Sequence, residues 1–230
     1  MAQHMSAQSV TISQRVVALA LVGVLATPVG GCAIYEKIER MHRELDNPYQ
    51  SKIVHGEQEI KLIDSMRAKG SYEAARERLT NAAQVIADRI STAVPGQTWK
   101  FDDDPYGQES ARAGLPCEKL TGDIARRPIA DAVIFGTTFS AEGFKTAVGV
   151  VREEAAKYGA ATESSLFNEP AKRDYEVQGN GYEFKLGEIK FATLDIHGDC
   201  FLLQKVLDLP PGQLPPEPPI LPTTTPTPTP

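Results

Sequence analysis

The sequence lacks an apolar run near its start that is long enough to cross a membrane. Residues 16–29 form an apolar run of 14 residues, whereas a spanning helix needs about 20. Arg15 is the only charged residue before Cys32, and it lies on the N-terminal side of this run. A short apolar run with a basic residue before it and small residues after it is typical of a secretory signal peptide. We therefore expect residues 1–31 to be removed from the mature protein.

The apolar run ends at Val29, Gly30, Gly31 and Cys32, a stretch that resembles a bacterial lipobox. In such signals the cysteine thiol takes a diacylglyceryl group, cleavage occurs just before the cysteine, and the new amine is acylated, commonly with palmitate. The alternative is an ordinary signal peptide with a chance cysteine. Because two or more acyl chains anchor a protein stably, we expect Cys32 to hold the protein at the outer face of the plasma membrane.

The chain also lacks an excess of basic residues. Without residues 1–31 it has 23 lysines and arginines against 30 acidic residues, a formal charge of −7. This balance does not favour nucleic acid as a partner. We expect a lipid-anchored tether over 32–55, a single folded domain over 56–208, and a disordered tail over 209–230, which holds ten of the 17 prolines.

Cysteine is scarce, with only Cys117 and Cys200 left besides Cys32. Outside the cytoplasm such a pair is free to form a disulfide, whereas redox pairs are usually two residues apart. A bridge between positions 83 apart would stabilise the fold by about 4.5 kcal/mol on the chain-entropy estimate. We expect a structural disulfide, and two free thiols or a redox pair are the alternatives.

Signatures of catalytic, metal and nucleotide-binding sites are missing. Residues 102–104 are three adjacent aspartates, whereas calcium loops place their acidic residues at alternate positions, so a solvated turn is expected. His197 has no evident base or ligand partner. Arg126 and Arg127 are expected in a surface turn, and an anion site is the alternative, which two arginines are too few to decide. We expect no catalytic residue, no metal and no cofactor, and an envelope hydrolase is the least favoured function.

Helical periodicity dominates the first part of the expected domain and strand patterns dominate the rest. Ser71 is expected to cap a long helix that ends before Pro95, and Ser140 a second helix that ends at Gly159. Asn180 and Gly181 predict a β-hairpin. Shorter helices are expected over 57–69 and 118–126, an irregular segment over 102–116, and strands over 98–101, 132–139, 162–167, 175–177, 182–186, 188–195 and 200–206. This order predicts an α+β fold, an antiparallel sheet with helices packed on one face.

Aromatic residues gather on the expected strands, where two interpretations stay open. They are Trp99, Phe101, Phe135, Phe139, Tyr182, Phe184 and Phe191. The first interpretation is a packed core between sheet and helices, since most such residues are simply buried. The second is an apolar cleft in the same place, which would hold a lipid or another apolar ligand.

Several stretches of the sequence resemble the LppA-like lipoproteins of mycobacteria, the group of LppA, LppB and LppV. The matching stretches include IDSMRAKGSYEAARERLT (63–80), GQTWKFDDDP (96–105), VREEAAKYGAATESSLFN (151–168) and GDCFLLQKVLDLP (198–210). The resemblance implies a secreted, single-domain protein lipidated at Cys32, and it supplies no catalytic residue. We expect a non-catalytic module of the cell envelope that binds a protein, a glycan or a lipid. A lipid or glycolipid carrier is the alternative.

Overall fold

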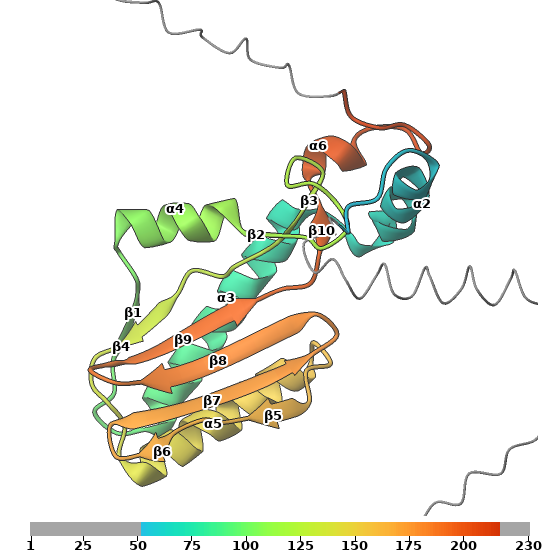
Figure 1. The fold of residues 1–230 in the computed structure, drawn as a ribbon. Helices are drawn as coiled ribbons and strands as arrows, with labels where there is room; N and C mark the ends of the chain where they lie inside the picture. Colours follow the sequence, from blue (N-terminus) through green and yellow to red (C-terminus); the bar gives the residue numbers. More distant parts are fainter. Residues whose placement is uncertain (1–51, 217–230) are drawn as a thin grey trace, which may run out of the picture. The chain divides into compact units, whose positions relative to one another are not determined.

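The computed structural model describes residues 52–216, so the signal peptide, Cys32, most of the tether and the end of the tail lie outside the described residues. The largest part of the fold is a seven-stranded antiparallel sheet in the order β1-β4-β9-β8-β7-β5, with β6 also paired to β7 (Figure 1). Its strands are β1 (Trp99–Phe101), β4 (Val133–Phe135), β5 (Thr162–Ser164), β6 (Asn168–Glu169), β7 (Lys172–Gly179), β8 (Tyr182–Glu188) and β9 (Ala192–His197).

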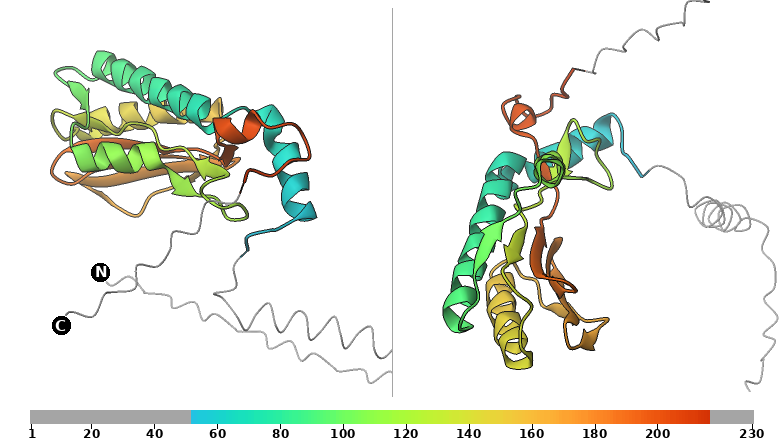
Figure 2. Two further views of the ribbon diagram at one scale, coloured as in Figure 1. Left: turned by 90° about the horizontal axis from the view of Figure 1, so that it is seen from above. Right: turned by 90° about the vertical axis from the view of Figure 1, so that its left-hand side faces the viewer.

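Helices α3 (Tyr72–Ala93) and α5 (Ala141–Ala156) lie together on one side of this sheet (Figure 2). The Ser71 hydroxyl accepts a hydrogen bond from the Ala74 backbone N–H, and the Ser140 hydroxyl accepts one from Gly143, so both helices begin where their caps predict. We call α3, α5 and the seven-stranded sheet the main layer. The α+β class, with an antiparallel sheet and helices on one face, is confirmed.

A smaller region lies at one end of the domain, and we call it the disulfide lobe (Figures 1 and 2). It consists of α2 (Glu57–Met66), the 3-10 turn η1 (Arg67–Lys69), α6 (Gln204–Leu207), and a three-stranded sheet of β2 (Leu115–Pro116), β3 (Ala125–Arg127) and β10 (Phe201–Leu202). Cys117 and Cys200 are joined by a disulfide, with their Cα atoms 5.8 Å apart. Val54, just before α2, donates its backbone N–H to the carbonyl of Lys119, and its side chain packs against the hydrophobic cluster of the lobe. The chain that leads into α2 is therefore in contact with the disulfide lobe.

The hairpin around Asn180 and Gly181 forms as predicted. Both residues have positive φ, 49° and 82°, as a two-residue turn between β7 and β8 requires. β7 pairs with β8 from Arg173 opposite Glu188 to Gly179 opposite Tyr182. Gly159 also has a positive φ of 74°, at the end of the α5 segment where the sequence predicts a helix stop.

Several local predictions are wrong. The helix expected over 118–126 is absent, because residues 125–127 pair as β3 with both β2 and β10. The strand expected over 200–206 stops at Leu202, because the Glu73 carboxylate accepts the Gln204 backbone N–H (3.0 Å) where α6 begins. The segment over 102–116 contains α4 (Pro105–Ala113). The strand expected over 188–195 begins only at residue 192, because β8 continues to residue 188 and residues 189–191 form the turn.

Candidate functional site

The three aspartates at 102–104 begin a helix. The Asp104 carboxylate accepts the Gly107 backbone N–H (2.8 Å) as the N-cap of α4, and Asp102 accepts the Asp104 N–H (3.0 Å). Asp103 pairs with Lys100, whose ammonium lowers the pKa of the Asp103 carboxyl. Over residues 52–216 no group of three histidines, cysteines or acids could hold a metal ion. The triplet is therefore a capping structure, with Pro105 at the first helical position.

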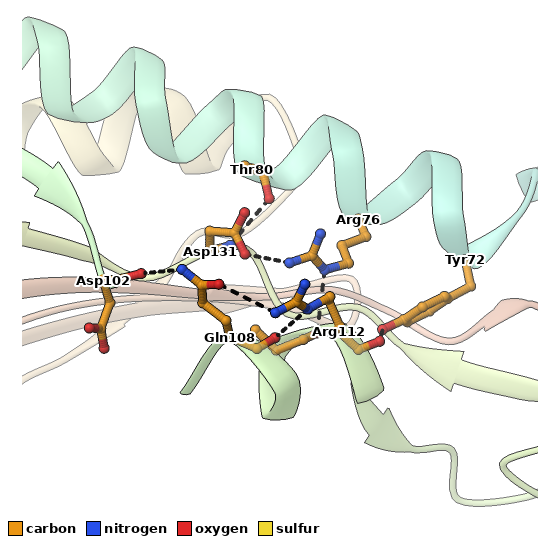
Figure 3. A network of polar contacts seen from close by, with 8 residues as sticks. Tyr72, Arg76, Thr80, Asp102, Gln108, Arg112 and Asp131 are labelled. Carbon is orange, nitrogen blue, oxygen red and sulfur yellow. Dashed lines mark hydrogen bonds and ion pairs between the residues drawn. The ribbon is translucent and has the colours of Figure 1, made fainter. Parts of the chain in front are cut away.

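Polar side chains of α3 then fix α4 in place (Figure 3). The Tyr72 hydroxyl donates to the carbonyl of Arg112 (2.8 Å) at the end of α4. Arg76 pairs with Asp131 and also donates to the carbonyl of Ala111 (3.4 Å). Because Tyr72 and Arg76 lie one turn apart on α3, they form a polar seam. The polar groups of Tyr72 and Arg76 are engaged by groups of α4 and by Asp131, so we assign no ligand to this seam.

His197 lies at the end of β9, opposite Glu183 on β8. Its Nδ1 atom is 3.6 Å from a Glu183 carboxylate oxygen, and both side chains are about one-quarter exposed. Lys185 donates to the same Glu183 (2.8 Å) and lowers the pKa of that carboxyl, chiefly through this hydrogen bond. Asp199 instead pairs with Lys69 and accepts the Cys200 backbone N–H (2.7 Å). The His197–Asp199 pairing that a hydrolase hypothesis needs is therefore not formed.

A well-defined hollow, which we call the disulfide pocket, lies in the disulfide lobe. Its volume is about 730 Å³, within the usual range for small-molecule sites. Its walls come from α2 and η1, from the segment around the disulfide, and from β3. The lining residues are Leu62, Ser65, Met66, Lys69, Pro116, Cys117, Glu118, Lys119, Leu120, Arg127, Asp199 and Cys200.

The pocket combines an apolar floor with a charged rim. Met66, Leu120 and Cys117 belong to the core of the lobe, so the floor is continuous with buried hydrophobic side chains. On the rim, Lys69 pairs with Asp199. Lys119 forms no ion pair within residues 52–216.

Arg127 is the most distinctive group on this rim. Its guanidinium donates to two carbonyls, those of Gly198 (3.0 Å) and Gly181 (3.4 Å), and meets no carboxylate among the residues described. Its positive charge is therefore held in position but not neutralised. The sequence interpretation of Arg126 and Arg127 as a surface turn is wrong, because both lie on β3, and only Arg127 reaches the pocket.

Side chains fill the space between the sheet and its helices. Phe135 and Phe184 are at most 1% exposed, and Phe139 is buried beside them. Trp99, Phe101 and Tyr182 are half-buried against the same cluster. The packed-core interpretation is thus confirmed for these aromatic residues, and the disulfide pocket lies elsewhere. Phe191 is the exception, since it lies in the β8–β9 turn and is 48% exposed.

The disulfide pocket could not be anticipated from the sequence. The pairing of Cys117 with Cys200 was expected, but no feature of the amino-acid sequence predicts that α2 packs beside these two cysteines. Cys32, the predicted lipidation site, lies outside the described residues. Within residues 52–216 no helix has the length and apolar character to cross a membrane.

Comparison with known proteins gives a consistent result. Residues 46–204 match the model of the LppA family, described as a lipoprotein confined to pathogenic Mycobacterium. The chain is 68% identical over 211 residues to lipoprotein LppA of Mycobacterium tuberculosis H37Rv, covering 92% of both chains. It is 67% identical over 216 residues to lipoprotein LppB of the same strain, covering 94% of both.

A solved structure is also similar to this chain. The crystal structure of LppA from Mycobacterium tuberculosis has a TM-score of 0.69 and 72% sequence identity. The match covers 76% of this chain and 99% of that one.

Proposed function

Because this chain belongs to the LppA family of mycobacterial lipoproteins, we propose that it is a lipid-anchored, non-catalytic binding module on the outer face of the plasma membrane. Cys32 would carry the S-diacylglyceryl group and the N-acyl chain, after removal of residues 1–31. Two or more acyl chains suffice for stable anchoring. The disulfide pocket would be the binding site.

One observation carries the choice of site: a cationic guanidinium without a carboxylate partner beside an apolar floor. Arg127 lines the pocket and meets no carboxylate among the residues described, and Met66 and Leu120 provide the apolar surface. An arginine presents several N–H donors in a fixed plane, which suits carboxylate and phosphate groups. The pocket therefore favours a small amphiphile with an apolar body and an anionic head, such as an acyl chain with a carboxylate or phosphate.

Anchoring is tested in mycobacterial cells that produce the full chain. The wild-type protein should incorporate radiolabelled palmitate and fractionate with membranes. The Cys32→Ser variant should remain unprocessed and unlabelled. Labelling of the Cys32→Ser variant would contradict lipid attachment at this residue.

Ligand binding is tested with the mature chain carrying Cys32→Ser, so that no acyl group of its own can enter the pocket. The probe is a dansylated fatty acid, and its competitors are myristic acid and the uncharged myristyl alcohol. We expect the acid to compete about tenfold or more better than the alcohol, because a charge-assisted hydrogen bond contributes roughly 1.5–3 kcal/mol. Arg127→Met should remove this preference while keeping the apolar stem of the side chain.

Arg126→Met provides the matched control for the binding test. Arg126 also donates to backbone carbonyls, those of Gly122 and Ala113, but it does not line the pocket. Equal binding of acid and alcohol by the wild-type chain would contradict an anionic ligand. An equal loss of preference in Arg126→Met would contradict the assignment to this pocket.

A further inference from the structure

Four exposed hydrophobic side chains gather on two neighbouring turns at one end of the main layer. They are Leu166 (83% exposed), Phe167 (45%), Ile189 (74%) and Phe191 (48%), and we call them the apolar tip. Phe167, Ile189 and Phe191 line one shared hollow of about 480 Å³ with Lys172 and Lys190. The β8–β9 turn and β6 lie at the end of the domain away from α2 (Figure 1). Contiguous exposed apolar surface of this kind marks an interaction site.

Hydrogen bonds hold both turns in place. The Asp174 carboxylate accepts the backbone N–H groups of Leu166 (2.9 Å) and Phe167 (2.6 Å). In the second turn the Ile189 N–H donates to the carbonyl of Phe191 (3.3 Å). The apolar side chains are thus presented to solvent by ordered backbone, and little conformational entropy is lost when they bind.

Lysines stand beside this apolar surface without acidic partners. The Lys172 ammonium lies 4.4 Å from the centroid of the Phe167 ring, and Lys190 lies between Ile189 and Phe191 in sequence. Neither lysine forms an ion pair within residues 52–216. Lysines next to exposed apolar side chains are well placed at the surface of a bilayer. There the methylene groups of the lysine side chain lie along the apolar region, and its ammonium contacts the lipid phosphate groups.

We propose that the apolar tip docks on the surface of the membrane to which the protein is anchored. Nineteen residues separate Cys32 from Lys52, and an extended chain of that length reaches roughly 65 Å. The 22-residue helix α3, which runs along the main layer, is about 33 Å long. The tether is therefore long enough for the end of the domain away from α2 to reach the bilayer.

Apolar insertion is the main contribution to this docking. The mature chain carries a formal charge of −7, so an anionic surface repels the domain as a whole. Leu166 and Ile189 would enter the headgroup region while Lys172 and Lys190 contact lipid phosphates. Docking in this orientation turns the disulfide lobe, at the other end of the domain, away from the bilayer (Figure 1). This inference depends on lipid anchoring and not on a ligand in the disulfide pocket.

The test uses the mature chain with Cys32→Ser, so that any membrane binding comes from the folded domain and its own side chains. Binding to phosphatidylcholine vesicles is measured by co-sedimentation. The wild-type side chains should bind, and the double variant Leu166→Ser and Ile189→Ser should bind at least about tenfold more weakly, because each apolar side chain adds a substantial part of the partition energy. Since both side chains point to solvent, the double variant should keep the thermal unfolding temperature of the parent.

Tyr106→Ser is the matched control, because Tyr106 is 78% exposed on α4 and does not line the hollow of the apolar tip. It should bind vesicles as the parent does. Equal binding by the double variant and the parent would overturn the proposal. Dimerisation of the parent in solution that the double variant loses would also overturn it, because the tip would then be an interface between two copies of this chain.

Discussion

The main layer buries 22 hydrophobic residues in one cluster, whereas the disulfide lobe buries eight, counted over residues 52–216. The main layer contains no disulfide, and its strands pair over as many as seven positions. In the lobe, β10 pairs with β3 over two positions, and the disulfide joins Cys200, just before β10, to Cys117, just after β2. A small core rarely stabilises itself, so a crosslink is most useful where the core is thinnest.

The difference in core size between the two regions also determines where there is space for a ligand. In the main layer the side chains between sheet and helices are nearly all inaccessible to solvent, and the interior is filled. In the lobe, α2 and the segments around the disulfide line a space that few apolar side chains fill. This space is the disulfide pocket, of about 730 Å³. Arg67 adds a further link, because its guanidinium donates to the carbonyl of Leu207 (3.2 Å), the last residue of α6, and to that of Leu209 (2.9 Å).

Removing the disulfide should have the largest effect on stability, and it should destabilise the disulfide lobe more than the main layer. The double variant Cys117→Ser and Cys200→Ser should lose about 4.5 kcal/mol of unfolding free energy on the chain-entropy estimate. Denaturant unfolding measures the total loss, and amide hydrogen exchange locates it. We expect the amides of β10 and β3 to exchange much faster than those of β8. A uniform acceleration over both regions would show that the lobe does not open by itself.

Breaking the buried ion pair should have the next largest effect, this time in the main layer. Arg173 and Glu188 pair at 2.8 Å with side chains 8% and 0% exposed. Glu188 also accepts the Phe139 N–H (2.8 Å), just before the cap of α5. Arg173→Met leaves the Glu188 carboxylate buried without its partner, which costs about 3 kcal/mol. Thermal and denaturant unfolding should show this loss.

A second substitution separates charge burial from packing in the same place. Adding Glu188→Gln to Arg173→Met removes the unpaired charge, so a large part of the lost stability should return. Hydrogen exchange in β10 should stay as in the parent in both variants. An increase there as large as in β8 would mean that the two regions unfold as one unit.

The main layer was largely predictable from the sequence because its signals are local. Ser71 and Ser140 begin helices by capping the next turn, and Asn180 with Gly181 supplies the backbone conformation of the hairpin. The turn at 189–191 was missed because the Arg173–Glu188 pair, which keeps residue 188 inside β8, forms between strands. The error placed Ile189 and Phe191 within a strand, although they lie exposed in the turn.

The disulfide lobe was poorly predicted because its structure depends on contacts between distant segments. Residues 118–126 have a helical pattern, yet β3 forms there through pairing with β2 and β10. The Glu73 carboxylate at the start of α6 is 131 positions away in sequence from Gln204. The α4 helix is a different failure, since Asp104 followed by Pro105 is a local cap signal, whereas only a solvated turn was expected there from the sequence.

Removing the cap of α4 should have a smaller effect than either change above. Asp104→Ala deletes the acceptor for the Gly107 N–H, which costs about 1 kcal/mol. Asp103→Ala is the matched control, because that exposed side chain contacts only Lys100 and should change stability by less than about 0.5 kcal/mol. Thermal unfolding of both variants distinguishes a cap from a general loss of negative charge. Equal effects would contradict the capping assignment.

The smallest expected effect concerns Asp195 on β9, which lies on the opposite face of the sheet from its core-facing neighbours Leu194 and Ile196. Burial raises the pKa of Asp195, although His197 and Lys185 nearby act in the opposite direction. A carboxyl with a raised pKa binds its proton more readily in the folded chain, so its contribution to stability falls as the pH rises from the unfolded pKa, near 4, through the folded value. Asp195→Asn, which cannot ionise, should therefore unfold at a higher temperature than the parent at pH 7. The difference should shrink toward pH 3, and a constant difference across this range would contradict a burial cost at Asp195.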